Sequence, residues 1–193
     1  LVYFVILFAI LLTQHTKVMF EEVTTAFFVS LVVPVSFSIL VYIRDHYEHG
    51  LFYTLLVCVA AWIADTAAYF VGRAFGKHKL CPLISPHKTV EGAIGGVFFA
   101  VLFFVLFCFG YSKIRSGVHI SYLAATIDGA VCAVMGIVGD LMASVVKRQR
   151  GIKDFGHIMP GHGGVMDRFD SFLFVAPTLY LILQVLPIVT TLA

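Results

Sequence analysis

Charged residues are scarce in this chain. Asp, Glu, Lys and Arg make up 12% of the 193 residues, whereas 60% are hydrophobic, and the mean hydropathy is +0.98. A soluble domain is about 25% charged and about 45–50% apolar, so the composition excludes an ordinary soluble protein. No polar stretch is long enough to form a soluble domain of its own, and we expect one integral membrane domain.

Several other signals are missing. The four cysteines show no CxxC spacing, so we expect buried free thiols and no zinc site. The chain begins inside an apolar run, with no basic segment before it and no small-residue cleavage site after it. A signal peptide is therefore not predicted, and we interpret the start as lacking upstream spans. An internal repeat, which transporters often show, is not evident either.

Long apolar stretches dominate what is present. A helix needs about 20 apolar residues to cross the hydrocarbon core of a bilayer, and six stretches qualify, the first of them short. The predicted fold is an all-α polytopic transmembrane helical bundle, with residues 1–50 as N-terminal spans and residues 51–193 as the domain that carries loops 74–89 and 147–168. The six predicted spans cover residues 1–13, 23–43, 51–73, 90–111, 120–146 and 169–192.

The basic residues are distributed unevenly between the two sides of the membrane. Alternating spans place loops 14–22, 74–89 and 147–168 on one side, which carries ten of the lysines and arginines when Arg73 is included, against three on the other. Positive charge marks the cytoplasmic side, so these three loops are predicted to be cytoplasmic. A role of these lysines and arginines in binding phosphates would also explain their excess on this side of the membrane.

Acidic residues inside the predicted spans are costly and point to function by default. Asp65, Tyr69 and Arg73 recur at four-residue spacing, which places them on one helical face. The alternative is a buried ion pair between Asp65 and Arg73 or a nearby lysine. Asp128 lies toward the opposite side of the membrane, and for this residue we favour a structural role.

Asp140 has the strongest functional signal of the intramembrane acids. Gly136 and Gly139 lie just before it in the chain, the basic loop is near, and no basic residue lies within a turn of it. Ser144 and Lys147 follow on the same helical stripe. A metal ion would neutralise this carboxylate well, and a structural role for Asp140 is the alternative.

The segment 144–170, with the sequence SVVKRQRGIKDFGHIMPGHGGVMDRFD, combines five basic residues, three acids and two histidines with several glycines. Glycines favour turns over a helix and let backbone N–H groups approach phosphate oxygens. Lysine and arginine bind those oxygens, and carboxylates hold Mg²⁺ together with substrate phosphates. This composition suits phosphoryl or nucleotidyl transfer. The alternatives are an ordinary positive loop and a transition-metal site at His157 and His162.

The loop 74–89 is also basic, and two prolines stiffen it. Thr89 is placed to cap the helix that follows, and Lys88 beside that helix N-terminus would form an anion site. A capped helix start with lysines that reach the membrane surface is the alternative.

The polar residues of the two loops resemble a known pattern. The later segment is similar to the signature of the phosphatidate cytidylyltransferases, or CDP-diacylglycerol synthases, and Met159 is a conservative departure from it. Its matching residues are Ser144, Lys147-Arg148, Lys153-Asp154, Gly156, His162-Gly163-Gly164, Asp167-Arg168 and Asp170. The earlier segment matches at Asp65, Tyr69, Gly72-Arg73, Phe75-Gly76-Lys77, Ser85-Pro86, Lys88-Thr89 and Glu91-Gly92.

The resemblance implies an enzyme that joins CTP to phosphatidic acid and releases pyrophosphate and CDP-diacylglycerol. It implies Mg²⁺ held by Asp140 and Asp167, and a monovalent cation such as K⁺. It also implies membrane lipid as surroundings, no nucleic acid, a bacterial inner membrane location with the site facing the cytoplasm, and it leaves a homodimer open. The catalytic set would be Asp140, Asp167, Lys147, Arg148, Lys153, Asp154, His162, Arg168 and Asp170. The substrate-binding set would be Ser144, Gly163, Gly164, Asp65, Arg73, Lys88, Thr89 and Glu91.

Three other functions stay open from the residues alone. A related lipid enzyme that uses CTP, such as a polyprenol kinase or a CDP-archaeol synthase, would share the charged loops. An ion or proton transporter would use the intramembrane acids, and a structural membrane subunit would need none of these features. No pair of an aromatic and an amide residue stands out for binding cytosine.

Overall fold

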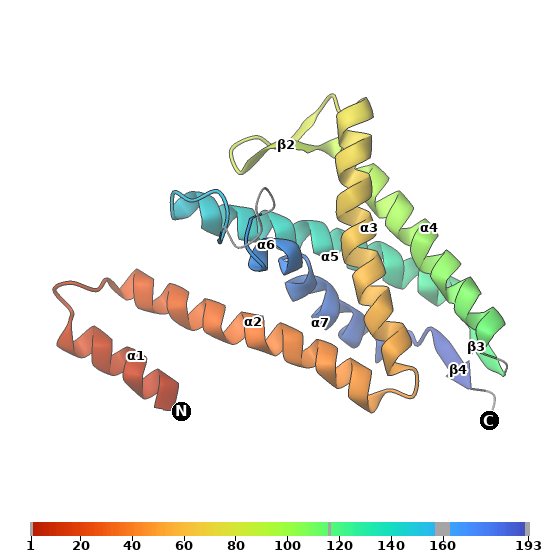
Figure 1. Ribbon diagram of the computed structural model, residues 1–193, viewed down its shortest axis with the longest axis horizontal. Helices are drawn as coiled ribbons and strands as arrows, with labels where there is room; N and C mark the ends of the chain where they lie inside the picture. Colours follow the sequence, from red (N-terminus) through yellow and green to blue (C-terminus); the bar gives the residue numbers. More distant parts are fainter. Residues whose placement is uncertain (1, 116, 157–162, 192–193) are drawn as a thin grey trace.

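A computed structural model describes residues 2–115, 117–156 and 163–191, which form a helical bundle with two small antiparallel strand pairs (Figure 1). The elements are α1 (Val2–Thr13), α2 (Phe20–His46), α3 (Gly50–Phe75), β1 (Lys79–Cys81), β2 (Ser85–Thr89), α4 (Val90–Ile114), β3 (Val118–Ile120), α5 (Tyr122–Gln149), α6 (Met166–Phe169), α7 (Phe172–Leu183) and β4 (Val189–Thr191). Four helices in this part of the chain, α2 to α5, are long and apolar enough to cross a membrane. The chain is therefore an all-α membrane bundle, as predicted.

The helices differ from the predicted spans mainly at the end of the chain. The second to fifth spans correspond to α2 to α5 within a few residues, but α7 ends at Leu183 rather than continuing through residues 184–192. Pro187 disfavours helical backbone at the residue before it and donates no backbone hydrogen bond. The chain turns there, and β4 pairs with β3. The loop 74–89, for which no strands were predicted, contains the β1–β2 hairpin.

The close approach of α3 and α4 determines where the site lies. Small residues line their contact: a Cβ added at Gly92 would lie 2.6 Å from the carbonyl oxygen of Ala68, and one at Gly96 would lie 2.8 Å from that of Ala64. Such small residues let helix backbones approach in a membrane. Thr89 caps α4 by accepting a 3.1 Å hydrogen bond from Gly92 N, which fixes the hairpin against the start of α4.

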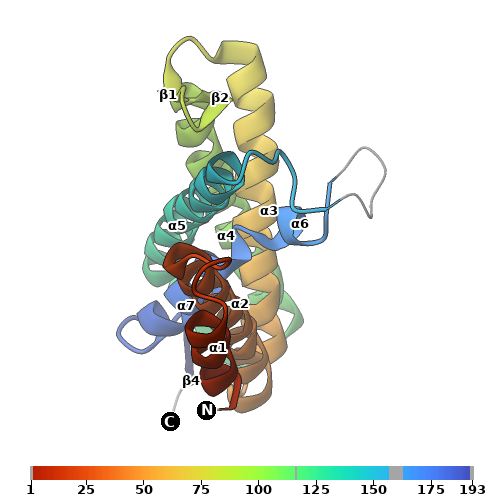
Figure 2. The same cartoon turned by 90° about the vertical axis from the view of Figure 1, so that its left-hand side faces the viewer.

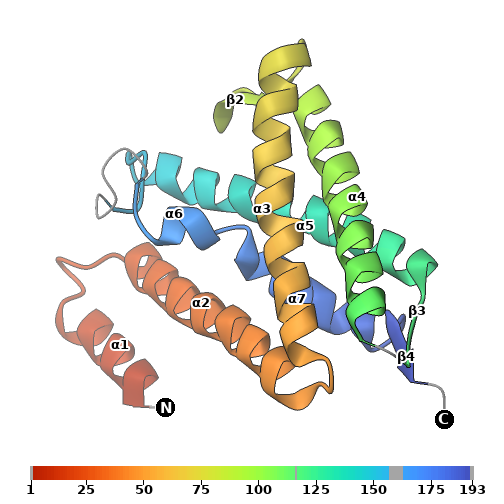
Figure 3. The ribbon, with the colours of Figure 1, turned by 45° about the vertical axis from the view of Figure 1, so that its right-hand side comes forward.

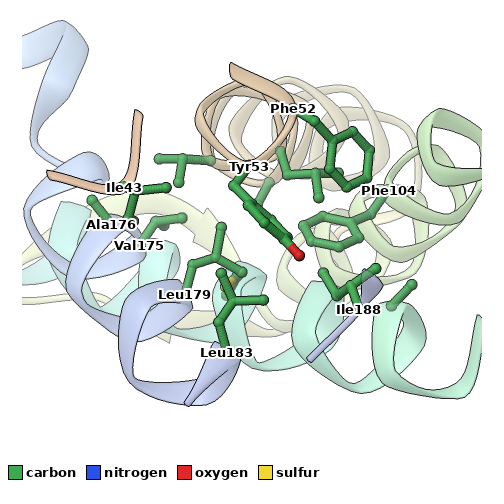
Figure 4. Close-up of a cluster of buried hydrophobic side chains, with 14 of the residues drawn as sticks. Ile43, Phe52, Tyr53, Phe104, Val175, Ala176, Leu179, Leu183 and Ile188 are labelled. Carbon is green, nitrogen blue, oxygen red and sulfur yellow. The ribbon is translucent and has the colours of Figure 1, made fainter. Parts of the chain in front are cut away.

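The largest buried apolar cluster lies where α2, α3, α4, α5 and α7 converge (Figure 4). Phe104 from α4, Leu56 from α3 and Leu179 from α7 are fully buried, and the rings of Phe52 and Tyr111 stack at 4.1 Å. The four cysteines are free thiols, as predicted, although two of them are only half-buried. This core holds the helices together below the polar site.

The bundle has two chemically different ends. The hairpin end, as we call it, carries the β1–β2 hairpin, the C-terminus of α5 and α6 (Figure 2). There Arg148 Nε donates to Ile84 O at 3.3 Å and Arg150 donates to Thr25 Oγ1 at 3.0 Å, so segments from two of the predicted basic loops meet each other and the start of α2. The far end carries the turn 47–49 and the β3–β4 pair, while α1 packs along α2 (Figure 3).

Candidate active site

A cavity of about 460 Å³ opens at the hairpin end, between α3, the hairpin, the start of α4 and α5. Asp65, Tyr69 and Arg73 of α3 all line it, which confirms that they share one helical face. Arg73 donates to the hydroxyl of Tyr69 at 3.2 Å rather than to Asp65. The alternative of an ion pair between Asp65 and Arg73 is therefore wrong.

Lys88 and Asp140 meet in this cavity. Lys88 reaches in from β2 and forms an ion pair with the carboxylate of Asp140 from α5. Both side chains are about three-quarters buried. No basic residue lies within a turn of Asp140 in the sequence, but the hairpin places a lysine from a distant part of the chain against it. Thr89 and Lys88 both line the cavity at the start of α4, and an anion site there stays a prediction.

A second polar group surrounds Asp167 of α6. Its Oδ1 accepts a 2.8 Å hydrogen bond from Lys147 Nζ, and its Oδ2 accepts bonds from Phe155 N at 2.8 Å and Gly164 N at 2.9 Å. Burial opposes ionisation of this carboxyl, but the Lys147 ammonium and the two N–H groups outweigh it and lower the pKa of Asp167 below its usual value. Asp167 is thus an anion that organises the loop around it.

Glycines make this loop arrangement possible. Gly163 has φ +79°, a left-handed conformation that favours glycine. A Cβ at Gly164 would lie 2.8 Å from Gly156 N, so a larger residue there would push apart the two loop segments that contain Gly156 and Gly164. Asp154 lies against Gly163, with its Oδ1 3.4 Å from the position of an added Cβ. The glycines of the signature are therefore needed for close backbone packing around Asp167.

The two groups are joined through Asp170. Its Oδ2 lies 3.9 Å from Lys147 Nζ, and its Oδ1 accepts a 2.9 Å bond from Ser171 N. The hydroxyl of Ser171 in turn donates to Asp65 Oδ2 at 2.9 Å. A chain of contacts thus runs from the loop to the cavity, and four carboxylates face two lysines along it.

The remaining predicted residues lie around these two groups. Arg148 is held by the hairpin, and Lys153 is exposed on the loop. Ser144 is buried in α5 outside the cavity lining. The carboxylate of Glu91 accepts bonds from the backbone of Lys77 and from His78, so it braces the hairpin base.

Two other predicted residues complete the set. Arg168 lies on α6 next to Asp167 and makes interactions of its own. His162, a member of the predicted catalytic set, lies outside the described residues, as does His157.

The carboxylate oxygens at the hairpin end are the type of ligand that a hard divalent ion such as Mg²⁺ prefers. Among the described residues, no three His, Cys, Asp or Glu side chains converge on a metal position. Mg²⁺ commonly takes only one or two carboxylates and completes its shell with substrate phosphates and water. Asp140 and Asp167, the predicted pair, belong to the cavity group and the loop group respectively, and each faces a lysine.

Sequence reasoning missed two residues of this site. His87 lines the cavity beside Lys88, and its place inside the Ser85–Thr89 motif was the available signal. Ser171 directly follows the last residue of the signature, but its contact with Asp65 joins residues 106 positions apart. No local pattern in the sequence indicates that contact.

Comparisons with known proteins agree with this chemistry. The sequence model described as "Cytidylyltransferase family" matches residues 1–186. The chain is 40% identical over 183 residues to the phosphatidate cytidylyltransferase of Bacillus subtilis strain 168, which covers 92% of this chain and 66% of that protein. It is 41% identical over 177 residues to the phosphatidate cytidylyltransferase of Staphylococcus aureus strain COL, covering 89% of this chain and 64% of the relative. The chain thus spans somewhat less than two thirds of the length of these relatives.

Proposed function

The chain belongs to the cytidylyltransferase family, and on that premise we propose that it transfers the cytidylyl group of CTP to phosphatidic acid, forming CDP-diacylglycerol and pyrophosphate. The observation that carries the proposal is the link between a cavity with basic and acidic walls and a glycine-rich basic loop beside it. A reaction between a lipid phosphate and a nucleoside triphosphate requires those two kinds of site side by side.

The cavity is our proposed site for the lipid phosphate. Arg73 and Lys88 supply positive charge, and the capped N-terminus of α4 at Thr89 supplies partial positive charge. Next to the cavity, Tyr69 and Phe70 of α3 are more than half exposed in a helix that is long enough to span a membrane. Phosphatidic acid would enter sideways from the bilayer, with its acyl chains remaining in lipid.

The loop is our proposed site for CTP. Lys147, Arg148, Lys153 and Arg168 would bind the triphosphate and the leaving pyrophosphate through charge-assisted hydrogen bonds. Gly163 and Gly164 would let backbone N–H groups approach the phosphate oxygens. Preorganised positive charge of this kind stabilises the charge that develops in phosphoryl transfer.

The reaction is one displacement at phosphorus. A phosphate oxygen of phosphatidic acid attacks the α-phosphorus of CTP, and the bond from that phosphorus to the oxygen bridging to the β-phosphate breaks. The electron pair leaves with pyrophosphate. The attacking phosphate is already ionised at neutral pH, so no strong general base is required, and His162 is assigned to positioning or phosphate binding.

Asp140 and Asp167 would hold Mg²⁺, which when bound neutralises charge on the phosphate oxygens. Asp154 and Asp170 would serve as further ligands or orient the arginines. Ser144 and Glu91 would support the substrates from the edges of the site. K⁺, a homodimer and the bacterial inner membrane stay predictions from the resemblance. A site that faces the cytoplasm stays a prediction from the resemblance and from the excess of basic residues in the loops.

A nucleotide panel tests the proposal. Purified protein in detergent receives phosphatidic acid, Mg²⁺ and one of CTP, ATP, GTP or UTP, and released pyrophosphate is measured. The proposal predicts release with CTP that depends on both phosphatidic acid and Mg²⁺. Release of CDP instead would indicate a lipid kinase, and a requirement for an ether-linked acceptor would indicate a CDP-archaeol synthase. Uptake of an ion into liposomes without consumption of CTP would indicate a transporter.

A further inference from the structure

Ser171 directly precedes α7, and its hydroxyl donates to an unusual acceptor. Thr24, Thr54 and Thr126 each donate to the carbonyl oxygen four residues earlier in their own helix, which is the common habit of such side chains. Ser171, which is 2% exposed, instead donates to Asp65 of α3. Its hydroxyl therefore serves a carboxylate on another helix.

Ser171 holds two carboxylates at the same time. Its hydroxyl donates to Asp65 Oδ2, and its backbone N–H donates to Asp170 Oδ1, both at 2.9 Å. One oxygen of each carboxylate is thus fixed, and the other Asp170 oxygen, Oδ2, lies 3.9 Å from Lys147. Asp65 and Asp140 both line the cavity. Ser171 therefore controls how the cavity group and the loop group face each other.

Glycines on α5 bring Ser171 to this place. A Cβ at Gly139 would lie 3.0 Å from the carbonyl oxygen of Asp170 and 3.3 Å from Cα of Ser171, and one at Gly136 would lie 3.8 Å from Cβ of Ser171. These glycines precede Asp140 along α5, so the helix that presents Asp140 also seats the residue that holds Asp65. The arrangement is built from three helices and is not a local turn.

We propose that Ser171 is a positioning residue that orients Asp65 toward Asp140 and so tunes the binding of a divalent cation at this centre. The proposal rests on the proposed function for its place in a reaction. It assigns no contact between Ser171 and a substrate: Ser171 acts through Asp65.

A buried serine elsewhere provides a matched control. Ser36 of α2 is 4% exposed, and its hydroxyl donates to the carbonyl oxygen of Leu173 at 2.9 Å. Ser171→Ala and Ser36→Ala each remove one buried hydrogen bond that ties α7 to another helix. They differ in the acceptor, which is a carboxylate in one case and a backbone carbonyl in the other.

The test titrates Mg²⁺ alone and follows the fluorescence of Trp62, which lies 5.4 Å from the Phe172 ring and three residues before Asp65. A Trp62→Phe variant supplies the background. Loss of a hydrogen bond to a charged group is expected to raise the half-saturating Mg²⁺ concentration about tenfold in Ser171→Ala. Ser36→Ala should stay within about twofold at a similar melting temperature. The same difference between Ser171→Ala and Ser36→Ala should appear in the Mg²⁺ concentration that gives half-maximal turnover.

Coupling to Asp65 gives the decisive comparison. If Ser171 acts through Asp65, the double variant with Asp65→Asn should need no more Mg²⁺ than Asp65→Asn alone. Equal Mg²⁺ requirements in Ser171→Ala and Ser36→Ala, or full additivity with Asp65→Asn, would overturn the proposal. Should Ser171→Ala not fold, Ser171→Cys keeps the volume with a weaker donor, and an unchanged requirement there would also overturn it. Because fluorescence needs no turnover, absence of CDP-diacylglycerol formation would refute the proposed function separately.

Discussion

Asp140 and Asp128 lie on the same helix and differ in almost everything that surrounds them. Asp140 lines the cavity at the hairpin end and forms an ion pair with Lys88. Asp128 is completely buried toward the far end, and neither of its oxygens has a hydrogen-bond partner among the described residues. Its neighbours include the thiols of Cys108 and Cys132. The role of an acidic residue within a membrane helix therefore depends on which residues of other segments lie against it.

The largest expected effect separates these two acids directly. Asp140→Asn removes the charge that we assign to cation binding, and turnover of CTP should fall by at least about 100-fold. Asp128→Asn keeps shape and polarity, and turnover should stay within about threefold of wild type because no described group uses that charge. Initial rates of pyrophosphate release, with melting temperatures to confirm folding, measure both. Equal losses in the two variants would contradict the distinction.

A pair of lysines sharpens the same contrast. Lys88→Met leaves the Asp140 carboxylate without its partner and removes a charge from the proposed lipid-phosphate site, so turnover should fall about 30-fold. Lys113, near the far end, lies over the ring of Phe109 at 5.3 Å. Lys113→Met should leave turnover unchanged. A normal rate in Lys88→Met would show that the ion pair has no part in the reaction.

Acid should weaken the hairpin end through Asp167. Burial alone would raise the pKa of this carboxyl, but Lys147 and the backbone N–H groups lower it below its usual value in the folded protein. The ionised form therefore adds stability. That stability is complete above the usual value of about 3.9 and is lost as pH falls through the lowered pKa. Melting curves should show wild type above Asp167→Asn at pH 6, with a difference that shrinks below about pH 4.

The far end supplies the control for this pH effect. Asp45 lies 3.9 Å from Arg44, and both side chains are more than half exposed, so the pair should contribute little. Asp45→Asn should match wild type in melting temperature across the same pH range. A difference between Asp167→Asn and wild type that does not change with pH would contradict the electrostatic explanation.

The smallest expected effect concerns the support of the hairpin. Glu91→Gln replaces the carboxylate that contacts His78 with a neutral amide but keeps an acceptor for the hairpin backbone, so turnover should fall about threefold. Tyr111→Phe removes the 2.9 Å hydrogen bond to His49 near the far end and should leave turnover unchanged. If both variants behave alike, the hairpin does not position Lys88.

Local pattern was enough to predict much of the fold. Long apolar runs identified α2 to α5, because crossing a bilayer requires continuous apolar length. Four-residue spacing placed Asp65, Tyr69 and Arg73 on one face, and the cavity confirms it. The short α7 and the β1–β2 hairpin were not predicted, because both depend on how a few turn residues pack against other elements.

Partners across the fold could not be predicted. The ion pair of Lys88 with Asp140 joins the hairpin to α5, and the hydrogen bond from Ser171 to Asp65 joins α7 to α3. Both contacts depend on the close packing that glycines such as Gly92 and Gly139 permit. Residue type and spacing indicated that Asp140 is unusual, but only the packed helices show what stands opposite it.

The central claim is that the hairpin end transfers a cytidylyl group to a lipid phosphate. The most direct measurement follows CTP labelled at either the α- or the γ-phosphorus, incubated with the purified protein, phosphatidic acid and Mg²⁺. The α-label should appear in the lipid product and the γ-label in pyrophosphate, and neither should move in Asp140→Asn. Appearance of the γ-label in lipid, or unchanged transfer by Asp140→Asn, would contradict it.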